Sequence, residues 1–487
     1  MLSSAPLPPD FLDLIEPKMG KEDFALFRHT LDRTLPPTSI RLNKQKKVLY
    51  PLDIGSIFPA TQLIPWCNGA YKLSDRPNFV GDPLWHTGYY YVQEASSMAI
   101  SLIKYHMPEE PIIAIDLCAA PGGKTTLLID DVLPEGSVLI ANEPIHKRAL
   151  SLVENVQKWG NSHVVVTNAY PDRFACCTET FDLVVVDAPC SGEGMFRKHS
   201  HAREEWSLQA VKHCQIRQRS ILNDAWKILK PGGFLLYSTC TFNEYENEDN
   251  IAYLSALGAD VIPLNISENM GIVSGRNAMG YRCYPHLVEG EGFFFCLLRK
   301  KKSETYEIAQ EKRAKKVNNK QKKPSKNNRS PKNEDAIHTL LTSGWEKEND
   351  IYAEEDGSIY VIPNNAKELL LKLADNNIPV LHRGIEVAEH KAGKIRPSSM
   401  LAFSLLFDAD ALPHIEVKKR EALSYIAGLS LDIKTSFKGF GSITYKGIPI
   451  GLVNAVANRA NNLFPKTHRL RADLQTILHE IEKNSTD

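Results

Sequence analysis

The chain has 487 residues, of which 43% are hydrophobic and 24% charged, and its 58 Lys and Arg balance 58 Asp and Glu. This length exceeds one ordinary hydrophobic core, so we expect two to four domains. No apolar run approaches the ~20 residues that span a bilayer, and the N-terminus lacks the basic and apolar segments of a secretory signal. We therefore expect a cytoplasmic protein without a membrane partner.

The nine cysteines occur at irregular spacings and form no Cys-x-x-Cys pair. An odd number in this pattern argues against a disulfide framework and against a zinc site. We expect reduced thiols and no metal.

The first 92 residues are predicted to form a small α+β module. Apolar residues at helical spacing indicate helices over residues 1–35, which Pro36 and Pro37 end. From Ser39 to about Trp85, short apolar runs are interrupted by Pro and Gly, a pattern typical of short strands and turns.

Residues 93–300 alternate between strand and helix patterns. The expected buried strands are residues 112–117, 137–142, 163–167, 181–187 and 233–238, with two more near 282–285 and 292–298. Helices such as 145–159 and 210–229 fill the gaps. This alternation predicts an α/β fold, a doubly wound Rossmann-like sheet that is mostly parallel and covered on both faces.

Residues 301–335 are predicted to be a flexible basic linker. Between Arg299 and Lys332, fourteen Lys or Arg stand against three Glu, with almost no apolar content. Such a segment can contact a phosphate backbone, and it can equally be a solvated connection. Beyond it, residues 336–487 combine apolar runs with Gly turns and end on a helical pattern from Ala472 to Ile481. One or two α+β or β-rich modules are expected there.

A loop of small residues follows the first strand of the predicted sheet. It contains Asp116, Leu117, Cys118, Ala119, Ala120, Pro121, Gly122, Gly123 and Lys124, without Walker or GxGxxG spacing. Small residues let the backbone approach a ligand closely. Glu143 and Asn168 end the next two strands, where an acid can bind ribose hydroxyls and an amide can bind an adenine edge. Either residue alone is also typical of a turn or cap, but the series predicts a nucleoside cofactor.

Two cysteines lie at strand ends. Cys190 follows the strand 181–187 in the sequence Asp-Ala-Pro-Cys, and Cys240 follows the strand 233–238 in Ser-Thr-Cys. The carboxyl ends of strands in open α/β sheets bind ligands, so we expect both thiols in one cleft. The alternative is that they are small buried hydrophobes, the usual state of cysteine.

The motifs at 116–124, 187–194 and 238–243 resemble those of RNA 5-methylcytosine methyltransferases, the Nol1/Nop2/Sun (RsmB/NOP) family. Arg41, Asn43 and the segments 91–97 and 284–294 also fit, so the resemblance covers roughly residues 10–300. The C-terminal half, with Gly384, 396–398 and 439–445, is similar to the bacterial branch that modifies small-subunit ribosomal RNA.

The resemblance implies S-adenosylmethionine as cofactor and methyl transfer to carbon 5 of cytosine through a covalent bond from Cys240 to carbon 6. It also implies that Cys190 assists release and that Asp187 holds the cytosine edge. The cofactor site would comprise Cys118, Ala119, Ala120, Pro121, Gly122, Gly123, Lys124, Glu143, Asn168 and Asp187.

The expected partner is RNA, by resemblance 16S ribosomal RNA or the 30S subunit, bound by a monomer. The target base must be single-stranded or flipped out to reach the thiol and the methyl donor. The N-terminal module, the linker and a PUA-like C-terminal region would bind the RNA. Arg197 and Lys198 are candidate phosphate contacts. Alternatives are the same chemistry on transfer RNA, methylation of an exocyclic amine without covalent attack, and a non-catalytic RNA-binding ribosome-assembly factor.

Overall fold

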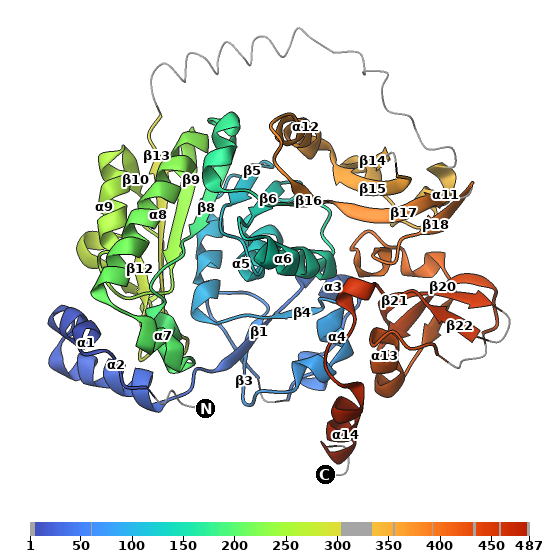
Figure 1. The fold of residues 1–487 in the computed structure, drawn as a ribbon, viewed down its shortest axis with the longest axis horizontal. Helices are drawn as coiled ribbons and strands as arrows, with labels where there is room; N and C mark the ends of the chain where they lie inside the picture. The colour runs from blue at the N-terminus through green and yellow to red at the C-terminus, as the bar shows by residue number, and fades with distance from the viewer. Residues whose placement is uncertain are drawn as a thin grey trace, which may run out of the picture.

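The computed structural model describes residues 5–59, 61–302, 334–353, 356–391, 393–431, 435–456 and 459–484. Figure 1 shows a central sheet with N-terminal elements below it and the C-terminal sheets on the right. The predicted linker over residues 301–335 lies almost wholly outside the described residues. Among the helices that the structure describes, none is long and apolar enough to cross a membrane.

A ten-stranded sheet forms the centre of the protein, in the order β11-β12-β13-β9-β8-β5-β6-β7-β16, with β10 beside β13. The five middle strands are parallel, and the strands at both edges are antiparallel. The parallel strands are β5 (Ile113–Asp116), β6 (Val138–Asn142), β7 (Val164–Thr167), β8 (Phe181–Asp187) and β9 (Leu229–Thr239). The antiparallel strands are β10 (Ala259–Val261), β11 (Val273–Ser274), β12 (Tyr281–Cys283), β13 (Phe293–Lys300) and β16 (Val380–Arg383). The predicted doubly wound parallel core is therefore present, but the antiparallel strands make the whole sheet mixed rather than mostly parallel.

The winding of the chain reverses next to β5. From β5 the chain proceeds to β6 and β7 on one side, and then crosses to β8 and β9 on the other. In open α/β sheets, ligands bind outside the carboxyl ends of the strands at such a switch point. The topology thus places a crevice between the loops after β5 and β8.

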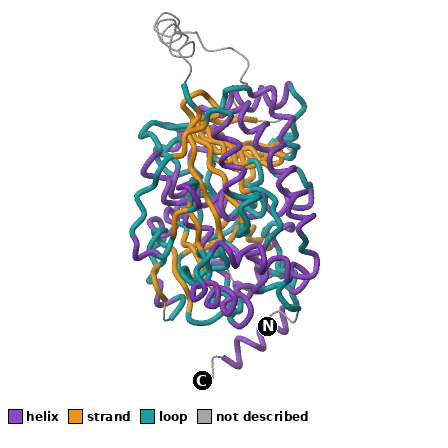
Figure 2. The backbone as a smooth tube through the Cα atoms, turned by 90° about the vertical axis from the view of Figure 1, so that its left-hand side faces the viewer, coloured by secondary structure: helices purple, strands orange, loops and turns teal. Residues whose placement is uncertain are grey.

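Helices cover both faces of the sheet, as Figure 2 shows by the strands in the interior and the helices outside them. One face is covered by the 3-10 helix Ser96–His106, α5 (Gly123–Leu127) and α6 (His146–Trp159). The other face is covered by α8 (Leu208–Ile228), α9 (Glu248–Ala256) and α12 (Lys367–Asp375). Because both faces are buried, the middle strands are nearly continuous apolar runs rather than alternating ones.

The N-terminal module packs against the loops that follow β8 and β9. In α2 (Lys21–Arg33), Phe24, Phe27 and Leu31 form the buried stripe. The ring of Phe27 lies edge-on to Phe242, with centroids 5.1 Å apart. An antiparallel sheet in the order β2-β3-β1-β4 follows the helices. The remaining bounds are α1 (Pro9–Ile15), β1 (Thr38–Leu42), α3 (Lys44–Leu49), β2 (Thr61–Leu63), β3 (Ala70–Leu73), α4 (Pro83–His86), β4 (Tyr90–Val92) and α7 (Ser200–Glu205).

The C-terminal part forms two four-stranded sheets, β14-β15-β17-β18 and β19-β20-β21-β22. The strands are β14 (Asn349–Ala353), β15 (Ser358–Pro363), β17 (Ile385–Lys391), β18 (Lys394–Pro397), β19 (His414–Glu416), β20 (Gly439–Tyr445), β21 (Ile448–Val456) and β22 (Arg459–Asn462). The helices are α11 (Glu334–His338), α13 (Lys419–Ile426) and α14 (Leu474–Asn484). Ile477 and Leu478 of α14 pack with Leu423 of α13 and with Val80, so the end of the chain returns to the N-terminal module.

The sequence did not predict that this C-terminal part also completes the central sheet. Strand β16 pairs with β7, and Leu369 and Leu373 of α12 join the hydrophobic core of one face. Gly160 marks a second close approach, because it caps α6 with a φ of 83° and a Cβ there would lie 2.0 Å from the carbonyl oxygen of Phe403. A side chain at this position would separate the two parts.

Candidate active site

The loops after β5, β8 and β9 leave the same edge of the sheet. Asp116 ends β5 opposite Val185, and Asp187 ends β8 opposite Ser238 of β9. The small-residue loop, the loop that carries Cys190 (residues 188–193, the Cys190 loop) and the loop that carries Cys240 (residues 240–247, the Cys240 loop) therefore begin side by side.

The two cysteines meet at this edge. The Sγ atoms of Cys190 and Cys240 are 3.2 Å apart, although the residues are 50 positions apart in sequence. The contact with the Cys240 thiol and burial raise the pKa of the Cys190 thiol well above its ordinary value. Cys190 consequently keeps its proton at neutral pH and can donate it in a hydrogen bond to the neighbouring sulfur.

A cavity of about 460 Å³ opens in front of Cys240. Its wall includes Cys240, Asp187, Lys124 and Phe293, together with Cys118, Ala119, Ala120, Pro121 and Gly123 of the small-residue loop. Cys190 is not part of this wall. Of the two thiols, Cys240 is thus the one that lines the cavity.

Asp187 and Lys124 form an ion pair across the cavity wall. The Lys124 Nζ atom lies 2.8 Å from Asp187 Oδ2, and the Ser238 hydroxyl donates to Asp187 Oδ1 at 2.8 Å. Burial by itself would lower the pKa of the Lys124 ammonium, but Asp187 and the nearby Cys240 raise it above its ordinary value. Lys124 is therefore a permanent positive charge in the same cavity wall as Cys240.

The small-residue loop is held by its backbone. Arg148 donates to the carbonyl oxygen of Ala120 at 3.0 Å, and the Asn155 amide donates to that of Pro121 at 2.9 Å. Gly122 has a φ of 114°, and a Cβ there would lie 3.1 Å from Leu152. Asp116 beneath the loop is fully buried, and burial followed by the charge of Asp187 raises its pKa to about 7.

Glu143 and Asn168 lie farther along the edge, outside the cavity wall. Glu143 is buried and accepts from the Ile145 N–H at 3.0 Å through Oε1. Its Oε2 accepts no hydrogen bond, although Arg148 Nη1 lies 3.3 Å away. A carboxylate oxygen with spare acceptor capacity fits a ribose hydroxyl. The Asn168 amide instead donates to the carbonyl oxygens of Glu143 and Pro144 at 2.7 and 3.0 Å, so it braces the turn that presents Glu143.

Of the two candidate phosphate contacts, Arg197 and Lys198, Arg197 binds the N-terminal module instead of facing solvent. Its side chain is buried and donates to Thr34 Oγ1 at 2.7 Å and to the Leu35 carbonyl at 2.8 Å. A guanidinium engaged in this way holds the N-terminal helices and is not offered to phosphate. Lys198 is exposed, lines the cavity and is ion-paired with Glu291.

The sequence did not identify a buried polar network behind the cysteines, which contains Ser191, Glu193, Thr241, Asn243 and Glu246. Its members stand within the cysteine motifs, but no residue pattern indicated that they contact one another. Nowhere in the part of the chain that the structure describes do three or more His, Cys, Asp or Glu side chains form a group that could hold a metal ion.

Three family models match this chain. The model described as 16S rRNA methyltransferase RsmB/F matches residues 104–299, that of the RsmF N-terminal domain matches 7–95, and that of the RsmF PUA domain matches 412–470. Two proteins named ribosomal RNA small subunit methyltransferase F are similar. That of Aliivibrio fischeri (strain MJ11) is 31% identical and that of Shewanella sp. (strain ANA-3) 30% identical, each over 83% of this chain and 84% of the relative.

A solved structure shares the fold. The crystal structure of NSun6 from Pyrococcus horikoshii with SFG superimposes with a TM-score of 0.51, and its sequence is 20% identical to this one. The match covers 61% of this chain and 99% of the other.

Proposed function

Since this chain belongs to the RsmB/F family of 16S ribosomal RNA methyltransferases, we propose that Cys240 is the nucleophile that activates a cytosine of that RNA for methylation at carbon 5. The observation that carries the proposal is the position of Cys240 in the cavity wall beside the Lys124–Asp187 ion pair.

Carbon 5 of cytosine is too weak a nucleophile to accept a methyl group unaided. Addition of the Cys240 thiolate forms a bond from Sγ to carbon 6 and makes carbon 5 enamine-like. The Lys124 ammonium, which shares the cavity wall with Cys240, stays charged during this step. Asp187, fixed by Lys124 and Ser238, can accept a hydrogen bond from the cytosine amino group and so hold the base in place for the attack.

Release reverses the addition. After methylation a base takes the proton from carbon 5, the electron pair of that C–H bond restores the double bond between carbons 5 and 6, and Cys240 leaves as a thiolate. The Cys190 thiol, 3.2 Å from the Cys240 sulfur, can donate a hydrogen bond to the departing sulfur. This supports unequal roles for the two cysteines, with Cys240 attacking and Cys190 assisting release.

The residues at the switch point fit S-adenosylmethionine, which supplies the methyl group. Residues 118–124 would hold the amino-acid part against a backbone with little side-chain bulk, and Asp187 borders the same space. The spare acceptor capacity of Glu143 Oε2 fits the ribose, and Asn168 holds Glu143 in place.

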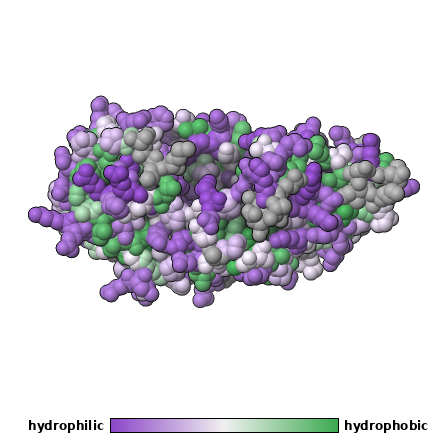
Figure 3. Space-filling view, turned by 90° about the horizontal axis from the view of Figure 1, so that it is seen from below, coloured by the Kyte–Doolittle hydropathy of each residue, from purple (hydrophilic) through white to green (hydrophobic). Residues whose placement is uncertain are grey.

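The RNA must present an extruded or single-stranded cytosine to the cavity. We propose that the N-terminal module and the PUA region flank this RNA. We also propose that the enzyme acts as a monomer in the cytoplasm. The proposed domain limits are 1–92, 93–300, 301–335 and 336–487. The face seen from below in Figure 1 is largely hydrophilic, with scattered hydrophobic residues (Figure 3), which suits a polar partner.

Purified protein incubated with labelled cofactor and either naked 16S ribosomal RNA, small subunits or transfer RNA tests the proposal. Labelled 5-methylcytosine in 16S RNA or small subunits is expected, and Cys190→Ala should trap a protein–RNA adduct that survives denaturant. Methylation of transfer RNA alone would overturn the substrate assignment. An active Cys240→Ala protein would overturn the covalent mechanism and favour direct transfer.

A further inference from the structure

Two glutamates cross between the cysteine loops in opposite directions. Glu193, after Cys190, accepts the backbone N–H groups of Phe242 at 2.6 Å and Asn243 at 3.0 Å through Oε2. Glu246, after Cys240, accepts the backbone N–H of Ser191 at 3.0 Å. Each carboxylate therefore holds the backbone of the other cysteine's loop.

A side-chain amide links the two carboxylates. Asn243 Nδ2 lies 2.8 Å from Glu193 Oε1 and 2.8 Å from Glu246 Oε1. Gln218 of α8 donates to Glu246 at 2.6 Å, and the Trp206 indole donates to Glu193 at 3.1 Å. Both carboxylates are fully buried, with 0% exposure. Buried carboxylates tied to several donors leave little freedom to the backbone that they bind.

We propose that Glu193 and Glu246 are positioning residues that hold the Cys190 and Cys240 loops in register, so that both thiols act on one cytosine. This role rests on the proposed function of the two cysteines. It goes beyond that function by assigning the 3.2 Å distance between the sulfur atoms to a pair of side chains that do not line the cavity.

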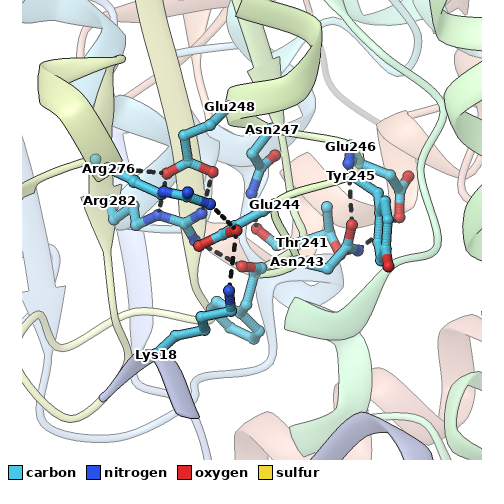
Figure 4. Close-up of polar contacts among 12 residues, drawn as sticks. Lys18, Thr241, Asn243, Glu244, Tyr245, Glu246, Asn247, Glu248, Arg276 and Arg282 are labelled. Carbon is cyan, nitrogen blue, oxygen red and sulfur yellow. Dashed lines mark hydrogen bonds and ion pairs between the residues drawn. The ribbon is translucent and has the colours of Figure 1, made fainter. Parts of the chain in front are cut away.

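The Cys240 loop contains its own matched control. Figure 4 shows Glu244 turned towards Lys18 and Arg276, while Glu246 lies at the other end of the turn beside Asn243. Glu244 makes ion pairs of 3.2 and 2.8 Å with these two residues and does not reach the Cys190 loop. We call the contacts of Glu193 and Glu246 with the opposite cysteine loops the clamp. Removing the charge of Glu244 tests the loss of a carboxylate from the Cys240 loop without breaking the clamp.

Oxidation of the two thiols tests the geometry without RNA. Diamide takes two electrons and two protons from Cys190 and Cys240 and leaves a disulfide. The rate at which this disulfide forms depends on how closely the two sulfur atoms are held. We expect Glu246→Gln and Glu193→Gln to slow this reaction about tenfold or more, and Glu244→Gln to leave it within about twofold. Peptide mapping by mass spectrometry follows the bond, and thermal unfolding and cofactor binding report on folding. Unchanged rates in folded Glu246→Gln protein would overturn the proposal.

If either glutamine variant fails to fold, Asn243→Ala keeps both carboxylates and removes the amide between them. It should slow disulfide formation in the same direction, and a rate equal to that of the unaltered protein would again overturn the proposal.

The amount of covalent RNA–protein adduct is a second measurement, and it separates a positioning role of the glutamates from a general loss of structure. With both cysteines present, a loosened clamp should impair release more than attack, so Glu246→Gln should accumulate a denaturant-stable RNA adduct while product formation falls. A merely structural role would lower adduct and product in proportion, and that result would refute the clamp. If Cys240→Ala still methylated RNA, the proposed function would fail while the disulfide rates would still report on the clamp.

Discussion

The two sides of the switch point are built from different parts of the chain. On the side of β8 and β9, side-chain contacts hold the site together, because two thiols are in contact and buried carboxylates connect their loops. On the side of β5 and β6, the backbone dominates, because the small-residue loop is held through its carbonyl groups by Arg148 and Asn155. Under the proposed function, the reaction would depend on individual side-chain atoms on the first side, and cofactor binding would depend on the shape of the backbone loop on the second.

The largest effect is expected at the thiol side. Cys240→Ala removes the proposed nucleophile, so product formation should fall by a factor on the order of 10⁴ or more, while the dissociation constant of S-adenosylmethionine should change little. Tritium incorporation into 16S RNA and calorimetric titration with the cofactor measure the two quantities. Parallel losses in both would show that the two sides are not separable.

Asp187→Asn should lower kcat by about 10²-fold, because the amide no longer carries the charge that pairs with Lys124 and faces the cytosine. Asp182→Asn is the matched control. Asp182 lies on the same strand and pairs with Lys230 at 2.7 Å, but it lies near the other end of β8, so kcat should be unaffected. Equal losses in the two variants would assign the effect to the strand rather than to the site.

On the cofactor side, Glu143→Gln replaces a carboxylate oxygen that has spare acceptor capacity with an amide group. Losing a hydrogen bond to a charged group costs about 1.5 kcal/mol, so the dissociation constant of S-adenosylmethionine should rise about tenfold. At saturating cofactor, kcat should remain near its original value. A fall in kcat with unchanged cofactor affinity would contradict the division between the two sides.

The smallest effect on turnover is expected for a change that acts on stability. Burial, followed by the charge of Asp187, raises the pKa of Asp116 from 3.8 to about 7. Between these values the folded protein retains a proton that the unfolded chain releases, so this residue makes the free energy of unfolding fall as the pH rises. Asp116→Asn should remove a fall of about 4 kcal/mol over that range. Urea unfolding at several pH values measures the slope, and equal slopes in both proteins would show that the Asp116 pKa is not raised.

Local patterns predicted much of the fold. Runs such as 181–187 are apolar because the middle strands are buried on both faces, and small residues in the loop after β5 indicated a backbone-lined cofactor site. The edge strand β16 could not be predicted in this way, since a four-residue strand has little periodicity and its partner β7 is far away in sequence. Arg197 was misjudged for a related reason: its charge suggested phosphate, but its partners come from the N-terminal module.

The sequence by itself determined which residue types stand at the strand ends, and therefore the family and the identity of the two thiols. Only the tertiary structure decided that their sulfur atoms lie 3.2 Å apart, that Cys240 and not Cys190 lines the cavity, and that Glu193 and Glu246 hold opposite loops. The physical reason is that local sequence governs backbone conformation and burial, whereas contacts between loops depend on the order and register of the strands that carry them.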